Sequence, residues 1–103
     1  MIETVKSKNG VPIRLTDERW SHITEEHAEL AGMKYDILET VAMPLKILAG
    51  NRDELLAVRY IDQLMKFLVV AYRETSVTDG FIITSFITSK KKSLNRREQL
   101  WPK

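Results

Sequence analysis

Residues 67–88, FLVVAYRETSVTDGFIITSFIT, contain two strands joined by a turn, and this pair decides the fold class. Phe67–Tyr72 is apolar at successive positions, which is typical of a central strand whose two faces are both covered. The connecting segment closes on Asp79-Gly80, a dipeptide favoured in hairpin loops. Phe81–Thr88 then predicts the antiparallel neighbour of the first strand.

Segments upstream of this hairpin predict three further strands. Val11–Leu15 alternates between apolar and polar residues and predicts a short strand, with Pro12 suited to a sheet edge because proline lacks an amide donor. Leu45–Leu48 and Glu54–Ile61 predict two more strands on either side of a polar turn.

Two helices are predicted between the first strand and the others. Thr16 is a natural N-cap for a helix that runs to Leu30, with acidic residues in its first turn. A second helix is expected from about Lys34 to Met43, where Pro44 stops it.

Helices followed by a run of strands are typical of an α+β domain. We therefore expect a single domain over residues 1–103, in which two N-terminal helices pack on a roughly four-stranded antiparallel sheet. The other face of the sheet is expected to be open to solvent or to a ligand. A basic C-terminal tail follows, since the segment after Ser89 has few apolar residues to bury.

Composition limits the function classes. The chain has no cysteine, so disulfides and thiolate metal sites are excluded. No apolar run approaches the ~18 residues of a membrane helix, and the N-terminus lacks the apolar region of a signal peptide. We expect a cytoplasmic protein.

Charge is distributed unevenly along the chain. Residues 90–103 carry six basic residues and one acid, whereas residues 1–89 carry ten basic and thirteen acidic residues. Such segregation indicates a polyanion contact near the C-terminus, although a solvated tail that keeps the protein soluble has the same composition.

The two histidines differ in their predicted surroundings. His27 shares a helical stripe with Trp20 and Ile23, so it is expected to face the sheet near the end of its helix. There it could act as a general acid or base, or it could be a partly buried histidine that is hydrogen-bonded to a carbonyl. His22 falls on a solvated face. The i, i+5 spacing separates the two imidazoles by roughly 140° around a helix, so no metal site is expected.

Hydroxyls and cations gather on the predicted strands. Thr84, Phe86 and Thr88 alternate along one strand and share a face, on which the threonines could contact phosphate or sugar while the ring stacks on a base. By the same alternation, Ser85 faces the other way with Phe81, Ile83 and Ile87. Arg59 projects from one strand, and Arg73 ends the next. The alternative is that the threonines are ordinary strand residues and Phe86 is core.

These residues suit one reaction that needs neither metal nor cofactor. The chain has no Gly-x-Ser-x-Gly elbow and no Gly-rich phosphate loop, so no cofactor is expected. In RNA, the 2′-hydroxyl attacks the adjacent phosphate, and the enzyme supplies proton transfer and charge neutralisation. A histidine, one or two cations and a hydroxyl cover those roles.

The chain also resembles a nuclease superfamily. The blocks that carry the likeness are RLTDERWSHITEEHAEL, DILETVAMPLKI, ELLAVRY, KFLVVAYRE and DGFIITSFITSK. Their order over residues 12–101 is similar to that in the barnase–EndoU–colicin–RelE (BECR) superfamily, most of all to its phage-associated branch. The resemblance implies metal-independent RNA cleavage by a toxin-like protein, and an antitoxin or immunity protein as a possible partner.

The resemblance also implies site residues. The helix histidine falls on His27, although the usual following proline is replaced by Ala28, and the strand arginine falls on Arg59. The strand hydroxyl falls on Thr84, with Ser85 as the less certain choice.

The basic residues after that strand fall on Lys90 and Lys91. Proton transfer is thus expected from His27, phosphate charge neutralisation from Arg59 and Lys90, and positioning of the phosphate from Thr84. Further RNA contacts are expected from Ser85, Phe86, Thr88, Lys91, Lys92, Arg96 and Arg97. The alternatives are a non-catalytic module that binds RNA, a ribosome or a protein, and an interaction protein whose basic tail pairs with an acidic antitoxin.

Overall fold

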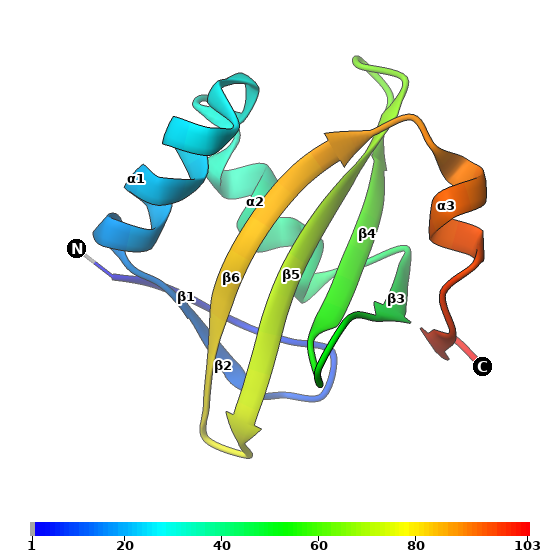
Figure 1. Cartoon of the computed structure of the whole chain (residues 1–103). Coiled ribbons are helices and arrows are strands. Elements are labelled where there is room, and N and C mark those ends of the chain that lie inside the picture. The colour runs from blue at the N-terminus through cyan, green and yellow to red at the C-terminus, as the bar shows by residue number, and fades with distance from the viewer. Residues whose placement is uncertain (1) are drawn as a thin grey trace.

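The computed structural model describes residues 2–103 and contains a seven-stranded mixed sheet with three α-helices (Figure 1). The sheet order is β1-β2-β6-β5-β4-β3-β7, and every neighbouring pair is antiparallel except β2–β6. The strands are β1 (Glu3–Lys6), β2 (Pro12–Leu15), β3 (Lys46–Ala49), β4 (Leu55–Ile61), β5 (Lys66–Ser76), β6 (Asp79–Thr88) and β7 (Gln99–Trp101). The helices are α1 (Asp17–Glu26), the 3-10 turn η1 (Ala28–Leu30), α2 (Lys34–Ala42) and α3 (Lys91–Asn95).

The expected fold of two N-terminal helices on a four-stranded antiparallel sheet is therefore wrong. The sheet has seven strands and one parallel pair, and the expected basic tail forms α3 and β7. The two edge strands escape sequence analysis because both are short. In β1 only Val5 packs on the core, between more polar neighbours, and β7 has three residues.

Pro12 does not mark a sheet edge. β2 lies between β1 and β6, so it is an inner strand. Pro12 is tolerated because it is the first residue of the strand, where it pairs with Lys6 next to the loop that connects β1 and β2.

The α1 helix starts as expected and ends earlier. The Thr16 hydroxyl accepts a hydrogen bond of 3.1 Å from the Arg19 amide, which satisfies one of the free donors of the first turn. The helix ends at Glu26 instead of Leu30, because His27 leaves the helical conformation and the 3-10 turn follows. No helix within residues 2–103 is long and apolar enough to cross a membrane.

The two faces of the sheet are covered unequally. On one face, which we name the α1/α2 face, side chains of α1 and α2 pack on Leu68, Val70 and Tyr72 of β5. On the opposite α3 face, Leu94 of α3 packs in a smaller cluster with Val58 and other residues of β3, β4 and β5. Figure 1 shows α3 apart from the two longer helices. The α3 face therefore has much less cover.

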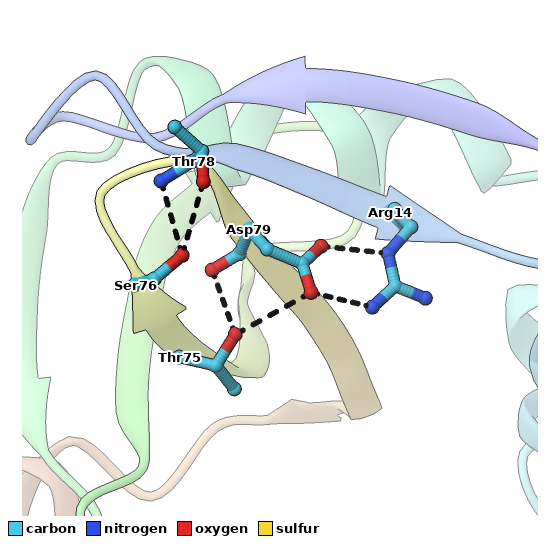
Figure 2. Close-up of polar contacts among 5 residues, drawn as sticks. All are labelled: Arg14, Thr75, Ser76, Thr78 and Asp79. Atoms are coloured by element: carbon cyan, nitrogen blue, oxygen red, sulfur yellow. Dashed lines mark hydrogen bonds and ion pairs between the residues drawn. The ribbon is translucent and has the colours of Figure 1, made fainter.

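The β5–β6 hairpin is locked to β2 at its turn. Arg14 of β2 donates from Nε and Nη2 to the two carboxylate oxygens of Asp79, at 2.9 and 3.0 Å (Figure 2). The Thr75 hydroxyl donates to the Asp79 carbonyl oxygen. At the next residue, Gly80, a β-carbon would lie 2.5 Å from the Arg73 carbonyl oxygen and 2.6 Å from the Ile13 side chain. Glycine at this position therefore lets β2 and β5 approach β6 from both sides.

The Arg14–Asp79 pair predicts a pH-dependent contribution to stability. Hydrogen bonding from Arg14 lowers the pKa of the Asp79 carboxyl. The contribution is therefore complete above the ordinary pKa of about 3.9 and is lost as the pH falls through the lowered value. We expect Asp79→Asn to have a lower urea midpoint than the parent near neutral pH, and a similar one at about pH 2. Asp62→Asn is a matched control. If the difference in urea midpoint between Asp79→Asn and the parent were as large at about pH 2 as near neutral pH, the ion pair would not be its cause.

Candidate nucleic-acid interface

The structure separates two of the predicted catalytic residues. Arg59 pairs across the strands with Leu68, which belongs to the α1/α2 core, and its guanidinium lies 2.9 Å from Glu39 of α2. Thr84 pairs with Ala71, which belongs to the α3-side cluster. Arg59 and Thr84 therefore lie on opposite faces of the sheet.

His27 lies at the C-terminal end of α1. Its side chain is 31% exposed, and its Nδ1 lies 3.8 Å from a carboxylate oxygen of Glu29. Glu29 also lines a cleft of about 620 Å³. The other residues that line this cleft are Gly32, Met33, Leu64, Lys66 and Ile87. Since Lys90 follows Ile87 closely in the chain, His27 and Lys90 lie at the same end of the sheet.

A β-bulge changes the expected alternation of β6. Consecutive residues Ala71 and Tyr72 of β5 pair with Thr84 and Ile82, which leaves Ile83 without a partner. Ile83 packs in the α3-side cluster, and Phe81, opposite Arg73, also falls on the α3 face. Phe81 and Ile83 therefore do not share a face with Ser85.

Ser85 is poorly placed for the predicted RNA contact. It is 0% exposed, on the α1/α2 face, and its hydroxyl donates a 2.8 Å hydrogen bond to the Val69 carbonyl oxygen. A buried hydroxyl with a satisfied donor has a structural role.

The α3 face carries all three phenylalanines of the chain. The register places Phe67, Phe81 and Phe86 there, and each is only partly buried. Thr84 and Thr88 lie on the same face, at cross-strand positions opposite Ala71 and Phe67. The result is a row of rings interleaved with hydroxyls along β5 and β6.

The aromatic row continues onto β4. Tyr60 is 42% exposed and meets Phe67 edge to face, with the ring centroids 5.2 Å apart. The sequence pattern did not predict that Phe67, Phe81 and Tyr60 lie on this face. Register counting from Gly80, which pairs with Glu74, places Phe67 opposite Thr88 only after the bulge at Ile83 is included.

The predicted basic residues line the side of this face. Lys90 is the N-cap of α3, and its amide donates 3.0 Å to the Thr88 hydroxyl. Lys91, Lys92 and Arg96 are exposed on α3 or directly after it. Arg97 is half-buried and donates to the Ala49 carbonyl oxygen. Burial of Leu94 holds this short helix on the sheet, because five residues are too few for a stable isolated helix.

Among residues 2–103, no group of three histidine, aspartate or glutamate side chains is arranged to hold a metal ion. Comparison of the chain with protein-family models, curated proteins and solved structures gives no match.

The position of Arg59 predicts a structural role. Both Arg59 and Glu39 are substantially exposed, and such pairs contribute about 0.2–1 kcal/mol. We expect Arg59→Met to lower the free energy of unfolding by no more than about 1 kcal/mol and to leave RNA affinity unchanged. Urea denaturation and fluorescence anisotropy measure the two effects, with Glu39→Gln as the matched variant. A tenfold loss of RNA affinity in Arg59→Met alone would contradict this assignment.

Proposed function

We propose that this protein binds single-stranded RNA on the α3 face of its sheet. The observation that carries the proposal is the placement of Phe67, Phe81 and Phe86, every phenylalanine in the chain, on the less covered face. A purely structural role in the core would favour the α1/α2 face, where the larger buried cluster lies.

Partly exposed rings on an antiparallel sheet suit unpaired bases. Base–aromatic stacking contributes about 1–3 kcal/mol per base and tolerates any sequence. Thr84 and Thr88 alternate with these rings and offer hydroxyls to phosphate or sugar oxygens. A double helix hides its base faces, so the arrangement favours single strands.

Basic residues beside the rings supply the electrostatic part of the binding. The stretch from Lys90 to Arg97 has five cations before the first acid, Glu98. Each cation that neutralises a phosphate of a single strand contributes roughly 0.7 to the slope of log affinity against log salt. The affinity should therefore fall steeply with salt concentration.

Removing a ring without removing bulk tests the stacking. We expect Phe86→Leu to weaken binding of a fluorescent single-stranded RNA at least about fivefold, because the ring supplies the stacking energy. Tyr35→Leu is the matched control, since Tyr35 is 74% exposed on α2. Fluorescence anisotropy gives both affinities, and circular dichroism checks the fold.

Equal affinities of Phe86→Leu, Tyr35→Leu and the parent would overturn the stacking surface. If Phe86→Leu loses affinity equally for RNA and for single-stranded DNA, the result supports stacking but not selectivity for RNA, because bases stack in both.

Cleavage of the bound RNA by 2′-hydroxyl attack is a second candidate function. Its support is that His27, beside Glu29, lies at the same end of the sheet as Lys90. A partly exposed imidazole next to a carboxylate is available for proton transfer, and a lysine offers charge for the phosphate. The resemblance to BECR nucleases favours the same reaction and an inhibitory protein partner.

The cleavage proposal predicts dependence on His27. In a chelator-containing buffer, the protein should convert RNA to fragments with 2′,3′-cyclic phosphate ends, and His27→Ala should slow cleavage by at least about 100-fold. Gel electrophoresis and mass spectrometry of the fragments measure this. His22→Ala is the control, and intact RNA with the parent protein would leave binding as the function.

A further inference from the structure

Three arginines converge on the turn between β3 and β4. Arg52 belongs to the turn itself, Arg73 comes from β5, and Arg97 comes from the segment between α3 and β7. Arg73 Nη2 donates a 2.9 Å hydrogen bond to the Arg52 carbonyl oxygen. Arg97 Nη1 donates to the Ala49 carbonyl oxygen at 3.2 Å. Segments distant in sequence thus bring cations to one place.

The guanidinium groups of Arg73 and Arg97 are held by uncharged carbonyl oxygens, not by carboxylates. Besides the Ala49 carbonyl, Arg97 Nη1 donates to Asn51 Oδ1 at 3.4 Å. The ion pairs within 4.0 Å among residues 2–103 involve Arg14, His27 and Arg59, and none involves this group. Carbonyl oxygens orient a guanidinium without cancelling its charge. The positive charge of the cluster is therefore retained.

Arg73 retains unused hydrogen-bonding capacity. Its Nε is buried and has no hydrogen-bond partner among residues 2–103. Its Nη2 is committed to the turn, so Nη1 is the group left for a ligand. A buried N–H donor without a partner is costly, and the charge of a nearby anion offsets part of that cost.

The cluster adjoins the aromatic row. Arg73 is the cross-strand partner of Phe81, on the α3 face. Phe81 and Thr88 are separated by seven residue steps along β6, or roughly 23 Å at ~3.3 Å per residue. The arginines therefore lie at one end of the row, and Lys90 lies at the other.

We propose that Arg52, Arg73 and Arg97 form a phosphate site that anchors one end of the bound strand. A planar guanidinium held in this way presents its remaining N–H donors to phosphate oxygens in a fixed direction, whereas a lysine ammonium is a point charge on a flexible stem. The proposal rests on the proposed function for the source of the phosphate, which is a backbone phosphate of single-stranded RNA. The site itself is defined by the arginines and is tested without RNA.

Pyrophosphate is the probe for the site. At tenfold excess over its dissociation constant, it should raise the thermal midpoint of the parent by about 5 °C or more, relative to chloride at equal ionic strength. Arg73→Gln and, independently, Arg97→Gln should reduce that rise by at least half. Arg19→Gln, at an exposed position on α1, should keep it.

The rise is compared within each variant, so a general loss of stability does not affect the result. Equal rises in thermal midpoint for Arg73→Gln and Arg19→Gln would overturn the site, because general screening of charge by pyrophosphate would explain both. A parent protein that shows no rise would overturn it as well.

The same variants identify the source of the phosphate. With RNA, Arg73→Gln should reduce the salt slope by about 0.7, and Arg19→Gln should leave it unchanged. An unchanged slope in Arg73→Gln, together with an Arg73-dependent pyrophosphate effect, would overturn RNA as the source. If neither the parent protein nor its variants bind RNA while the pyrophosphate effect persists, the proposed function fails and the anion site stands.

Discussion

Burial of β5 on both of its faces is the constraint on which the rest of the structure depends. Leu68, Val69 and Val70 are consecutive residues, and each is 0% exposed. Successive side chains of a strand point to opposite faces, so the chain must cover the sheet twice. The helices α1 and α2 cover one face with a large cluster. On the other face, Leu94 of α3 is the helical residue in the smaller cluster formed by residues 2–103, and Phe67, Phe81 and Phe86 are only partly buried.

A second constraint acts at the start of β6, where three strands meet. Gly80 pairs with Glu74 of β5 on one side and with Ile13 of β2 on the other, and neither neighbour leaves room for a β-carbon. The Arg14–Asp79 pair ties the same point to β2 from the surface. The parallel β2–β6 contact thus includes the buried Ile13 side chain, which packs directly against Gly80, and β1 pairs with β2 to form one edge of the sheet.

The central hairpin could be predicted because its signals are local. Phe67–Tyr72 has the apolar run of a central strand, and Asp79-Gly80 marks the turn. Thr16 likewise shows its capping function in the next three residues. The rest depends on distant partners: β1 forms because β2 is available, and α3 folds because Leu94 finds a cluster from β3 to β5. The separation of Arg59 from Thr84 likewise depends on a distant partner. Arg59 pairs with Glu39 of α2, and the sequence does not specify where that helix lies.

The bulge at Ile83 connects packing to the proposed function. Without it, strict alternation would place Phe81 on the same face as Ser85, under the helices. With it, Phe81 lies opposite Arg73 on the α3 face, so the aromatic row reaches the arginines. The two ends of the row then differ in rigidity. Arg73 and Arg97 are held by hydrogen bonds to carbonyl oxygens of the β3–β4 turn, whereas Lys90, Lys91 and Lys92 are exposed side chains that can adjust. A strand bound on this face would therefore meet a fixed phosphate contact at one end and adaptable charge at the other, which gives the surface a direction that composition alone does not supply.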